Sequence, residues 1–415
     1  MFSKLGKRKK LLIVSSVLAL SALIFILSHT SFSTSIPSME IPSNAESDFA
    51  LMAEAWNTIQ KVYVDRSALK PRILAYGAIG GMVESLGDNG HSTFLTPDMI
   101  REQRKISEGQ YKGVGIELRM ENGHVLIVAP LDGSPAQKAG LRSGEFITGV
   151  DGKRLIGLDL IQIVKLISGL SGTRVRLTIF DPANDSSRDV LLTRASINIV
   201  NVRWKHLPGT GIAQLRIAGF SKGVTDDLRK DLNKIRLQGI RGIILDLRDD
   251  PGGLLIEAVG CTSQFLRGGN VLFEKNAAGE IKPVPVRHGG DATQIPLVVL
   301  VNGGTASAAE IMAGAIQDAG RAKLVGNKTF GTGTVLDQFS LSDGSALMLA
   351  VEEWLTPKGH SIWHKGITPD LDMSLSAGVS PLFPDEEKDL TQQKLQATRD
   401  TQLQTAIKLL SGEKK

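Results

Sequence analysis

Ser307 stands where a predicted strand meets a predicted helix. The apolar run 297–301 predicts a strand, and Ile311 and Ile316 continue a helical pattern after the serine. The start of a helix carries free backbone N–H groups and the positive end of the helix dipole. Such groups stabilise an oxyanion that forms on a carbonyl under attack. We therefore expect Ser307 to be a nucleophile in acyl transfer.

We expect other polar side chains to support the structure around Ser307. Asp246 and Arg248, at the end of an apolar strand, are expected to form an ion pair that supports the following turn. Glu310 is expected to brace the start of the helix after Ser307. The chain shows neither the His-Glu-x-x-His pattern of zinc enzymes nor a phosphate loop or dinucleotide fingerprint. We expect no metal and no cofactor, and we interpret the single cysteine, Cys261, as a buried core thiol.

The elements that must position these residues begin with helices. Apolar residues recur at helical spacing between Phe49 and Tyr63, and a second helix is predicted from Pro71 to Leu86. The loop from Asp88 to Leu95 follows and contains His91. The soluble part of the chain is therefore expected to open with two helices.

From Tyr111 to Arg194 the pattern changes to short strands and turns, with a short helix that begins at Ser134-Pro135 and ends at Gly140. This stretch resembles a PDZ domain. The resemblance implies that the loop Gly113-Val114-Gly115-Ile116 binds the terminal carboxylate of a peptide that adds as a strand. The alternative is a PDZ-shaped module whose groove binds nothing.

After Gly211 apolar strands alternate with helical segments, which favours layered α/β structure with functional loops at the strand ends. The segment after Leu382 is charged and rich in glutamine, and we interpret it as a surface helix or coil.

Several motifs together resemble the carboxyl-terminal processing (tail-specific) serine peptidases. They are Leu245–Gly253, Thr305–Glu310, Thr329-Phe330-Gly331-x-Gly333, Trp354–Pro357 and Gly366–Asp370. The resemblance covers residues 47–373 and implies an α+β and α/β multidomain chain, with a crotonase-like layered α/β peptidase core, an inserted PDZ domain and N-terminal helices. The implied parts are a signal anchor (1–28), a linker (29–46), an N-terminal helical part (47–106), the PDZ domain (107–195), the peptidase core (196–374) and a C-terminal tail (375–415).

Within that family, Ser307 matches the nucleophile and the backbone N–H of Ala308 matches one oxyanion donor. The turn Pro251-Gly252-Gly253 resembles the source of the second donor, from either Gly252 or Gly253. Glycine suits this place because the backbone must approach the developing anion closely.

The chain departs from the family at the general base. Thr332 occupies the position of the catalytic lysine, and Leu336 occupies that of the glutamine that orients the lysine. A threonine hydroxyl cannot accept the proton of Ser307 at neutral pH. Without a replacement base, the rate would fall by several orders of magnitude.

Two residues could replace the lysine. His91 needs little tuning to act as a base near neutral pH, and its loop resembles the segment that supplies the catalytic histidine in tricorn-like relatives. By that analogy a carboxylate, Glu352 or Glu353, orients the site, and Glu353 is our choice. Lys328 is the second candidate, four residues before Thr332. The alternative is a structural role, in which His91 only forms hydrogen bonds within its loop.

The N-terminus predicts a membrane anchor. Leu11 to Leu27 is free of charge and close to the minimum of about 17 residues for crossing a bilayer, and five basic residues precede it. The rest of the chain would then lie outside the cytoplasm. The net charge of +5 over 415 residues comes partly from this basic start, so we expect no nucleic-acid partner.

The sequence thus predicts a membrane-anchored, extracytoplasmic serine endopeptidase that recognises the free C-terminus of protein or peptide substrates. Ser307 would be the nucleophile and His91 the base. The alternative from a different class is a catalytically silent pseudopeptidase that acts as a PDZ-based binding scaffold or regulator.

Overall fold

The computed structural model describes residues 41–87, 92–101, 111–121, 123–156, 158, 160–197, 200–376, 379–384 and 390–412. The chain divides into two units, residues 1–71 and 72–415. In the described part of the first unit, helix α2 (Glu46–Val62) confirms the predicted amphipathic helix, and none of its residues is buried. Helix α3 (Pro71–Glu84) confirms the second predicted helix.

No helix of these described ranges combines the length and the apolar character needed to cross a bilayer. The predicted anchor, Leu11 to Leu27, lies outside the described residues.

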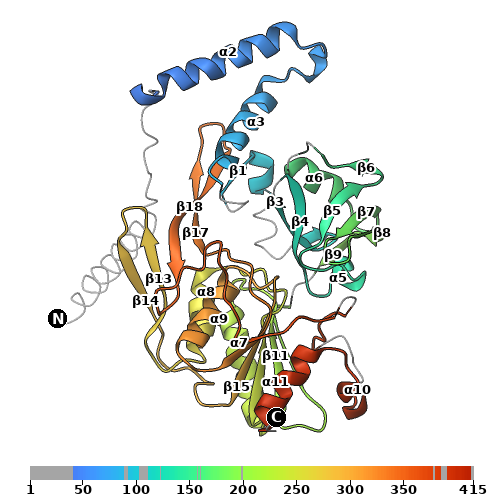
Figure 1. Cartoon of the computed structure of the whole chain (residues 1–415), viewed down its shortest axis with the longest axis vertical. Coiled ribbons are helices and arrows are strands. Elements are labelled where there is room, and N and C mark those ends of the chain that lie inside the picture. Colours follow the sequence, from blue (N-terminus) through green and yellow to red (C-terminus); the bar gives the residue numbers. More distant parts are fainter. Residues whose placement is uncertain are drawn as a thin grey trace, which may run out of the picture. The chain divides into compact units, whose positions relative to one another are not determined.

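The PDZ domain is an antiparallel sheet with two helices (Figure 1). Its strands follow the order β3-β4-β5-β7-β8, with β6 beside β5. The bounds are β3 (Ile116–Glu121), β4 (His124–Pro130), β5 (Phe146–Val150), β6 (Lys153–Arg154), β7 (Arg174–Asp181), β8 (Ser186–Thr193), α5 (Pro135–Lys138) and α6 (Leu160–Ile167). Strands β2 (Tyr111–Gly113) and β9 (Ala195–Ile197) pair where the domain joins the rest of the chain. The domain has its own apolar core, which includes Val114, Ile127, Ile163 and Leu177.

The second half of the chain is built on a six-stranded sheet of order β10-β11-β12-β15-β16-β19. All neighbouring pairs are parallel except β10–β11. The bounds are β10 (Val202–His206), β11 (Ile212–Ile217), β12 (Gly242–Asp246), β15 (Leu297–Val301), β16 (Lys323–Gly326) and β19 (Leu371–Asp372). Strands β11, β12 and β15 are buried along their whole length, which explains their nearly continuous apolar runs.

The sheet lies between two helical layers (Figure 1), and alternate residues of its strands belong to two separate apolar clusters. One face, which includes Leu215, Leu245 and Val299, packs against helices α7 (Val224–Leu237), α8 (Leu255–Ser263) and α9 (Ala308–Asp318). The opposite face, which includes Ile244 and Leu300, packs against helices α10 (Gln392–Gln396) and α11 (Thr401–Ser411). The two-residue period of a strand produces this division. The predicted layered core with an inserted PDZ domain is therefore confirmed.

A further antiparallel sheet has the order β1-β18-β13-β14, with β17 also paired to β18. The bounds are β1 (Thr93–Leu95), β13 (Asn270–Asn276), β14 (Ile281–Pro285), β17 (Thr334–Ser340) and β18 (Ala346–Leu355). This sheet joins β1, which begins two residues after His91, to the strands that follow the Thr332 loop.

The C-terminal segment differs from its prediction as a surface helix or coil. Leu395, Leu403 and Ala406 are buried against the six-stranded sheet, and Asp400 and Gln402 are each 1% exposed. The composition misled because glutamine and lysine make up the exposed face of α10, whereas a few spaced apolar residues of both helices cover the sheet.

Candidate active site

The candidate site lies at the carboxyl ends of three neighbouring parallel strands. Strands β12, β15 and β16 lie side by side, so the segments that leave them emerge at one edge of the sheet. These segments are the turn 248–253 after β12, the loop 302–307 after β15 and the loop 327–333 after β16. Residues far apart in sequence thereby meet around Ser307.

Ser307 is the N-cap residue of α9 and has a strained backbone. Its φ is 52° and its ψ is −118°, a conformation that costs a non-glycine residue about 1–3 kcal/mol. Such strain is typical of a nucleophile on a sharp turn between a strand and a helix. The preceding turn compensates for it: Thr305 is fully buried and its Oγ1 donates to Leu247 O at 2.8 Å.

Glu310 joins this turn to the neighbouring loop. Its buried carboxylate accepts hydrogen bonds from the backbone N–H groups of Ser307, Gly331 and Thr332 at 2.7–2.9 Å, and from the hydroxyls of Thr329 and Thr332. Burial raises the pKa of Glu310, although these hydrogen bonds oppose the rise. The predicted brace is confirmed, and it also positions the loop that carries Thr332.

Thr332 lies directly beside the nucleophile. Its Oγ1 accepts the Ser307 backbone N–H at 2.7 Å and donates to Glu310 Oε2 at 2.8 Å. The single hydroxyl proton is therefore already committed to a carboxylate. At the position where the family resemblance predicts a lysine, Thr332 therefore has a structural hydroxyl group.

Of the two candidate bases, Lys328 and His91, only Lys328 is among the described residues. Lys328 is exposed. His91 lies outside the described residues. Its neighbour Ser92 accepts the Ala350 N–H at 2.9 Å through Oγ, and β1 pairs with β18. Farther along β18, the Trp354 N–H donates to Gly333 O, next to Thr332, at 2.7 Å.

Glu353 lies on β18, opposite Thr334 of β17 and Lys275 of β13. Its Oε2 is 3.3 Å from the Lys275 Nζ, and its side chain is 21% exposed. Glu353, the carboxylate chosen from the sequence, therefore forms an ion pair with Lys275. Both residues lie in the sheet that also contains β1.

The glycine turn contacts the nucleophile. Gly252 has φ +96°, and a Cβ on it would lie 2.7 Å from Ser307 Cβ. Its N–H donates to Asp250 Oδ1 at 2.8 Å. Gly253 has φ +143°, and a Cβ there would lie 2.5 Å from Phe220 O. Across the described ranges, neither the Gly253 N–H nor the Ala308 N–H donates to an acceptor of the chain.

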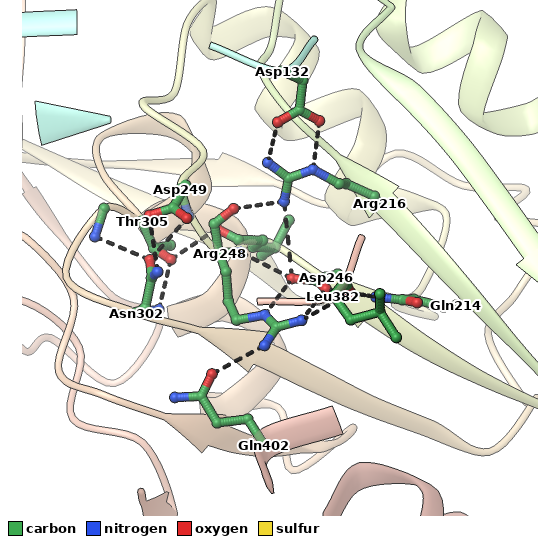
Figure 2. Close-up of polar contacts among 12 residues, drawn as sticks. Asp132, Gln214, Arg216, Asp246, Arg248, Asp249, Asn302, Thr305, Leu382 and Gln402 are labelled. Atoms are coloured by element: carbon green, nitrogen blue, oxygen red, sulfur yellow. Dashed lines mark hydrogen bonds and ion pairs between the residues drawn. The ribbon is translucent and has the colours of Figure 1, made fainter. Parts of the chain in front are cut away.

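A buried ionic network holds this turn (Figure 2). Arg248 Nε and Nη2 donate to the two carboxylate oxygens of Asp246 at 2.9 and 2.7 Å, and both side chains are fully buried. Burial disfavours the charged form of Asp246, but the charge and hydrogen bonds of Arg248 outweigh it and lower the pKa of that carboxyl. The predicted ion pair is confirmed. Asp249, with φ +53°, is held by reciprocal hydrogen bonds with the Asn302 side chain at 2.9 Å.

The network also joins the PDZ domain to the core, which sequence reasoning missed. Arg216 of β11 is fully buried, and its Nε and Nη2 donate to Asp132 of the PDZ domain at 2.6 and 2.7 Å. Arg216 Nη1 donates to Arg248 O at 2.6 Å. A second bridge runs from Ser143 Oγ to Asp249 Oδ1 at 2.7 Å. The sequence contained one signal for this contact, because Arg216 lies inside the apolar run 212–217 and a buried cation requires an anionic or hydrogen-bonding partner.

Asp250 is a further buried carboxyl that sequence reasoning did not single out. Desolvation raises the pKa of Asp250 well above its ordinary value. Its Oδ2 has no hydrogen-bond partner within the part of the chain that the structure describes. Its backbone O accepts the Ala306 N–H at 2.9 Å, so Asp250 ties the glycine turn to the loop that carries Ser307.

The predicted carboxylate-binding loop of the PDZ domain precedes β3. Gly115 has φ +77°, and Val114 is buried in the domain core. Among the described residues, the N–H groups of Val114 and Gly115 have no acceptor in the chain, and β3 pairs only with β4. The loop therefore offers free donors beside an open strand edge.

The described residues contain no cluster of three histidine, cysteine or acidic side chains that could hold a metal ion. Cys261 is fully buried, which confirms the predicted core thiol, and burial raises its pKa to about 12.

Comparison with known proteins agrees with this geometry. The model of peptidase family S41 matches residues 211–373, and a PDZ domain model matches residues 126–179. The carboxy-terminal processing protease CtpA of Bacillus subtilis is 32% identical over 379 residues, which cover 91% of this chain and 79% of the relative. The carboxy-terminal-processing protease of Bartonella bacilliformis is 36% identical over 303 residues, 72% of this chain and 69% of the relative.

Among solved structures, the photosystem II D1 C-terminal processing protease superimposes with a TM-score of 0.67 at 30% identity, over 79% of this chain and 93% of that one. The chain therefore belongs to peptidase family S41, as a PDZ-containing serine peptidase of the carboxy-terminal processing protease type.

Proposed function

We propose that this protein is a membrane-anchored, extracytoplasmic endopeptidase that cleaves proteins recognised at their C-terminus, with Ser307 as nucleophile. The observation that carries the proposal is the strained backbone of Ser307 at the start of α9, in contact with Gly252. The names of the relatives, which process carboxy termini, support the substrate class. The charge-free segment 11–27 after a basic start supports the membrane anchor.

In the proposed reaction, Ser307 Oγ attacks a substrate carbonyl while a base accepts its proton. The N–H groups of Gly253 and Ala308 would bind the resulting oxyanion, because neither has an acceptor within the described ranges. The base then returns the proton to the leaving amine, and water hydrolyses the acyl-enzyme. The Gly252 N–H is committed to Asp250, which favours Gly253 over Gly252 as the donor.

We assign the base to His91. The Thr332 hydroxyl is fully engaged, and Lys328 is exposed. Ser92 is anchored to β18, and that strand reaches Gly333 beside the Thr332 loop. Glu353, on the same strand, would orient the imidazole or polarise the site.

The PDZ domain would bind the C-terminal residues of the substrate through the loop 113–116. Its free N–H groups and the open edge of β3 suit a carboxylate followed by an extended peptide.

One observation favours the rival function, a silent pseudopeptidase that binds protein tails. In the described part of the chain, no lysine or histidine makes a hydrogen bond within the Ser307–Thr332–Glu310 cluster. Activity measurements decide between the two functions.

The test compares Ser307→Ala, His91→Ala and Lys328→Ala on an unstructured substrate with an apolar C-terminus. We expect the first two variants to lose at least about 10⁴-fold in kcat/KM and the third to keep its activity. Loss in Lys328→Ala with survival of His91→Ala would move the base to Lys328. Absence of turnover in the unsubstituted protein, together with absence of Ser307 labelling by a serine-reactive phosphonate, would establish the scaffold function.

A further inference from the structure

The C-terminal segment reaches the base of the glycine turn. Asp400 caps α11, where its Oδ1 accepts the Leu403 N–H at 2.9 Å. Its Oδ2 accepts Arg248 Nη1 and the Leu382 N–H, both at 2.8 Å. Asp400 is 1% exposed, so this carboxylate forms its contacts with Arg248 away from water.

The same segment supplies a second acceptor for Arg248 Nη1, and Asp246 supplies the acceptors for Nε and Nη2. Gln402 Oε1 accepts Nη1 at 3.1 Å, and the two carboxylate oxygens of Asp246 accept Nε and Nη2 (Figure 2). The ring of Phe383 lies over Arg216, with its centroid 3.6 Å from the guanidinium carbon, and its centroid is 5.6 Å from that of Arg248. Both acceptors of Nη1 therefore come from residues about 150 positions later in the chain.

Arg248 is the first residue of the turn that ends at Gly253. Its backbone O is held by Arg216, and the next residue, Asp249, is held by Asn302 in a left-handed conformation (Figure 2). The following residues place the Gly252 Cα against Ser307. A buried guanidinium that loses one of two carboxylate partners must move or admit water. Either change displaces the start of the turn.

We propose that Asp400 is a positioning residue for the peptidase reaction, and that residues 382–384 and 390–402 of the C-terminal segment complete the turn that supplies the oxyanion donor. The segment lies beyond residues 211–373, where the S41 family model matches. Asp400 acts through Arg248 and does not touch the reacting atoms. The inference rests on the oxyanion assignment of the proposed function.

The first test needs no catalytic activity. Full-length Asp400→Asn keeps the size of the side chain and the oxygen that caps α11, and removes the charge opposite Arg248. Thr391→Ala is the matched control, because Thr391 Oγ1 caps α10 by accepting the Lys394 N–H and makes no contact with Arg248.

Hydrogen exchange followed by mass spectrometry reports on the turn. We expect peptides that cover residues 248–253 to exchange at least about 5-fold faster in Asp400→Asn than in the unsubstituted protein. Thr391→Ala should leave them unchanged, and peptides from β7 and β8 should be unchanged in both variants. Unchanged exchange of the turn in Asp400→Asn, or equal acceleration in Thr391→Ala, would overturn the inference.

The second test measures phosphonate labelling of Ser307. We expect the maximal labelling rate of Asp400→Asn to fall about tenfold while the half-saturating reagent concentration stays within about twofold, because the donor is displaced and the binding surface is not. An unchanged maximal rate contradicts the positioning role. If the unsubstituted protein is not labelled, the proposed function fails, and hydrogen exchange still decides the role of Asp400. If Asp400→Asn does not fold, Gln402→Leu, which removes the 3.1 Å acceptor of Arg248 together with the Nε2 donor to Asn327 Oδ1 and Met373 O, is expected to change both readouts in the same direction.

Discussion

The Ser307 N–H donates to Thr332 Oγ1 at 2.7 Å, so Thr332, which the sequence places at the position expected for the family's lysine, is a direct neighbour of the proposed nucleophile. The same N–H is also 2.9 Å from Glu310 Oε2, and Thr332 Oγ1 donates to that oxygen. Threonine thus closes a small ring of hydrogen bonds at the start of α9. The ring stabilises the turn and leaves the hydroxyl of Thr332 without a proton-accepting role.

We expect Thr332→Val to change kcat/KM by less than about tenfold, because Glu310 remains as an acceptor for the Ser307 N–H. The free energy of unfolding should fall by about 1–2 kcal/mol, because both hydrogen bonds of the Thr332 hydroxyl are lost. Peptide hydrolysis and urea unfolding measure the two quantities. A loss as large as that of Ser307→Ala would show that the Thr332 hydroxyl takes part in proton transfer.

A lysine placed at residue 332 should restore activity to a protein that lacks the histidine base. We expect the triple variant His91→Ala, Thr332→Lys, Leu336→Gln to exceed His91→Ala by at least about tenfold in kcat/KM, since a partly buried lysine has a lowered pKa. The control carries Thr332→Arg in place of Thr332→Lys, because arginine does not lose its proton in proteins. Equal activity of the two triple variants would refute the rescue by an amine.

Asp250 should make stability depend on pH. Burial raises the pKa of this carboxyl well above its ordinary value, so the folded state holds a proton that the unfolded chain has lost. The contribution of Asp250 to stability is therefore present below the unfolded pKa and is lost as pH rises towards the folded pKa. Relative to Asp250→Asn, the free energy of unfolding should fall by up to about 1.4 kcal/mol per pH unit as the pH rises above about 4, the ordinary pKa of an aspartic acid. Urea unfolding at several pH values tests this, and parallel curves for the two proteins would contradict it.

The ion pair between the PDZ domain and the core should be important for stability. Asp132→Asn leaves the buried Arg216 guanidinium with weaker acceptors, so we expect a loss of about 3 kcal/mol in the free energy of unfolding. Asp291→Asn removes the partner of Arg229 in an exposed pair and should cost less than about 0.5 kcal/mol. Chemical unfolding followed by tryptophan fluorescence compares the two. Equal effects would mean that the buried pair has little net value.

Gly115→Val should impair peptide recognition and leave the peptidase centre intact. Gly115 has φ +77°, where a β-branched residue is strained, and among the described residues its N–H has no acceptor in the loop that we propose to bind the carboxylate. We expect at least about tenfold weaker binding of a C-terminal peptide, with unchanged phosphonate labelling of Ser307. Gly172→Ala is the control, with φ +88° at a position outside the loop where an added Cβ meets nothing within 4 Å. Equal peptide affinities in the two variants would argue against the loop 113–116 as the binding site.

The sequence by itself determined the local chemistry: a serine between an apolar strand and an amphipathic helix, a glycine turn after a second strand, and a PDZ domain before both. Each of these depends on residues close together in the chain, where periodicity and turn chemistry apply. The Asp246–Arg248 pair and the Glu310 brace could also be predicted, because each is two or three residues from its partner.

Only the tertiary structure decided which distant groups satisfy the buried charges around the turn. Asp132 and Asp400 lie 84 and 152 residues from the arginines that they bind. No spacing rule joins such positions, since the partner of a buried cation is set by how layers of the fold pack. Packing likewise placed the C-terminal helices on the sheet and put Thr332 against the Ser307 N–H.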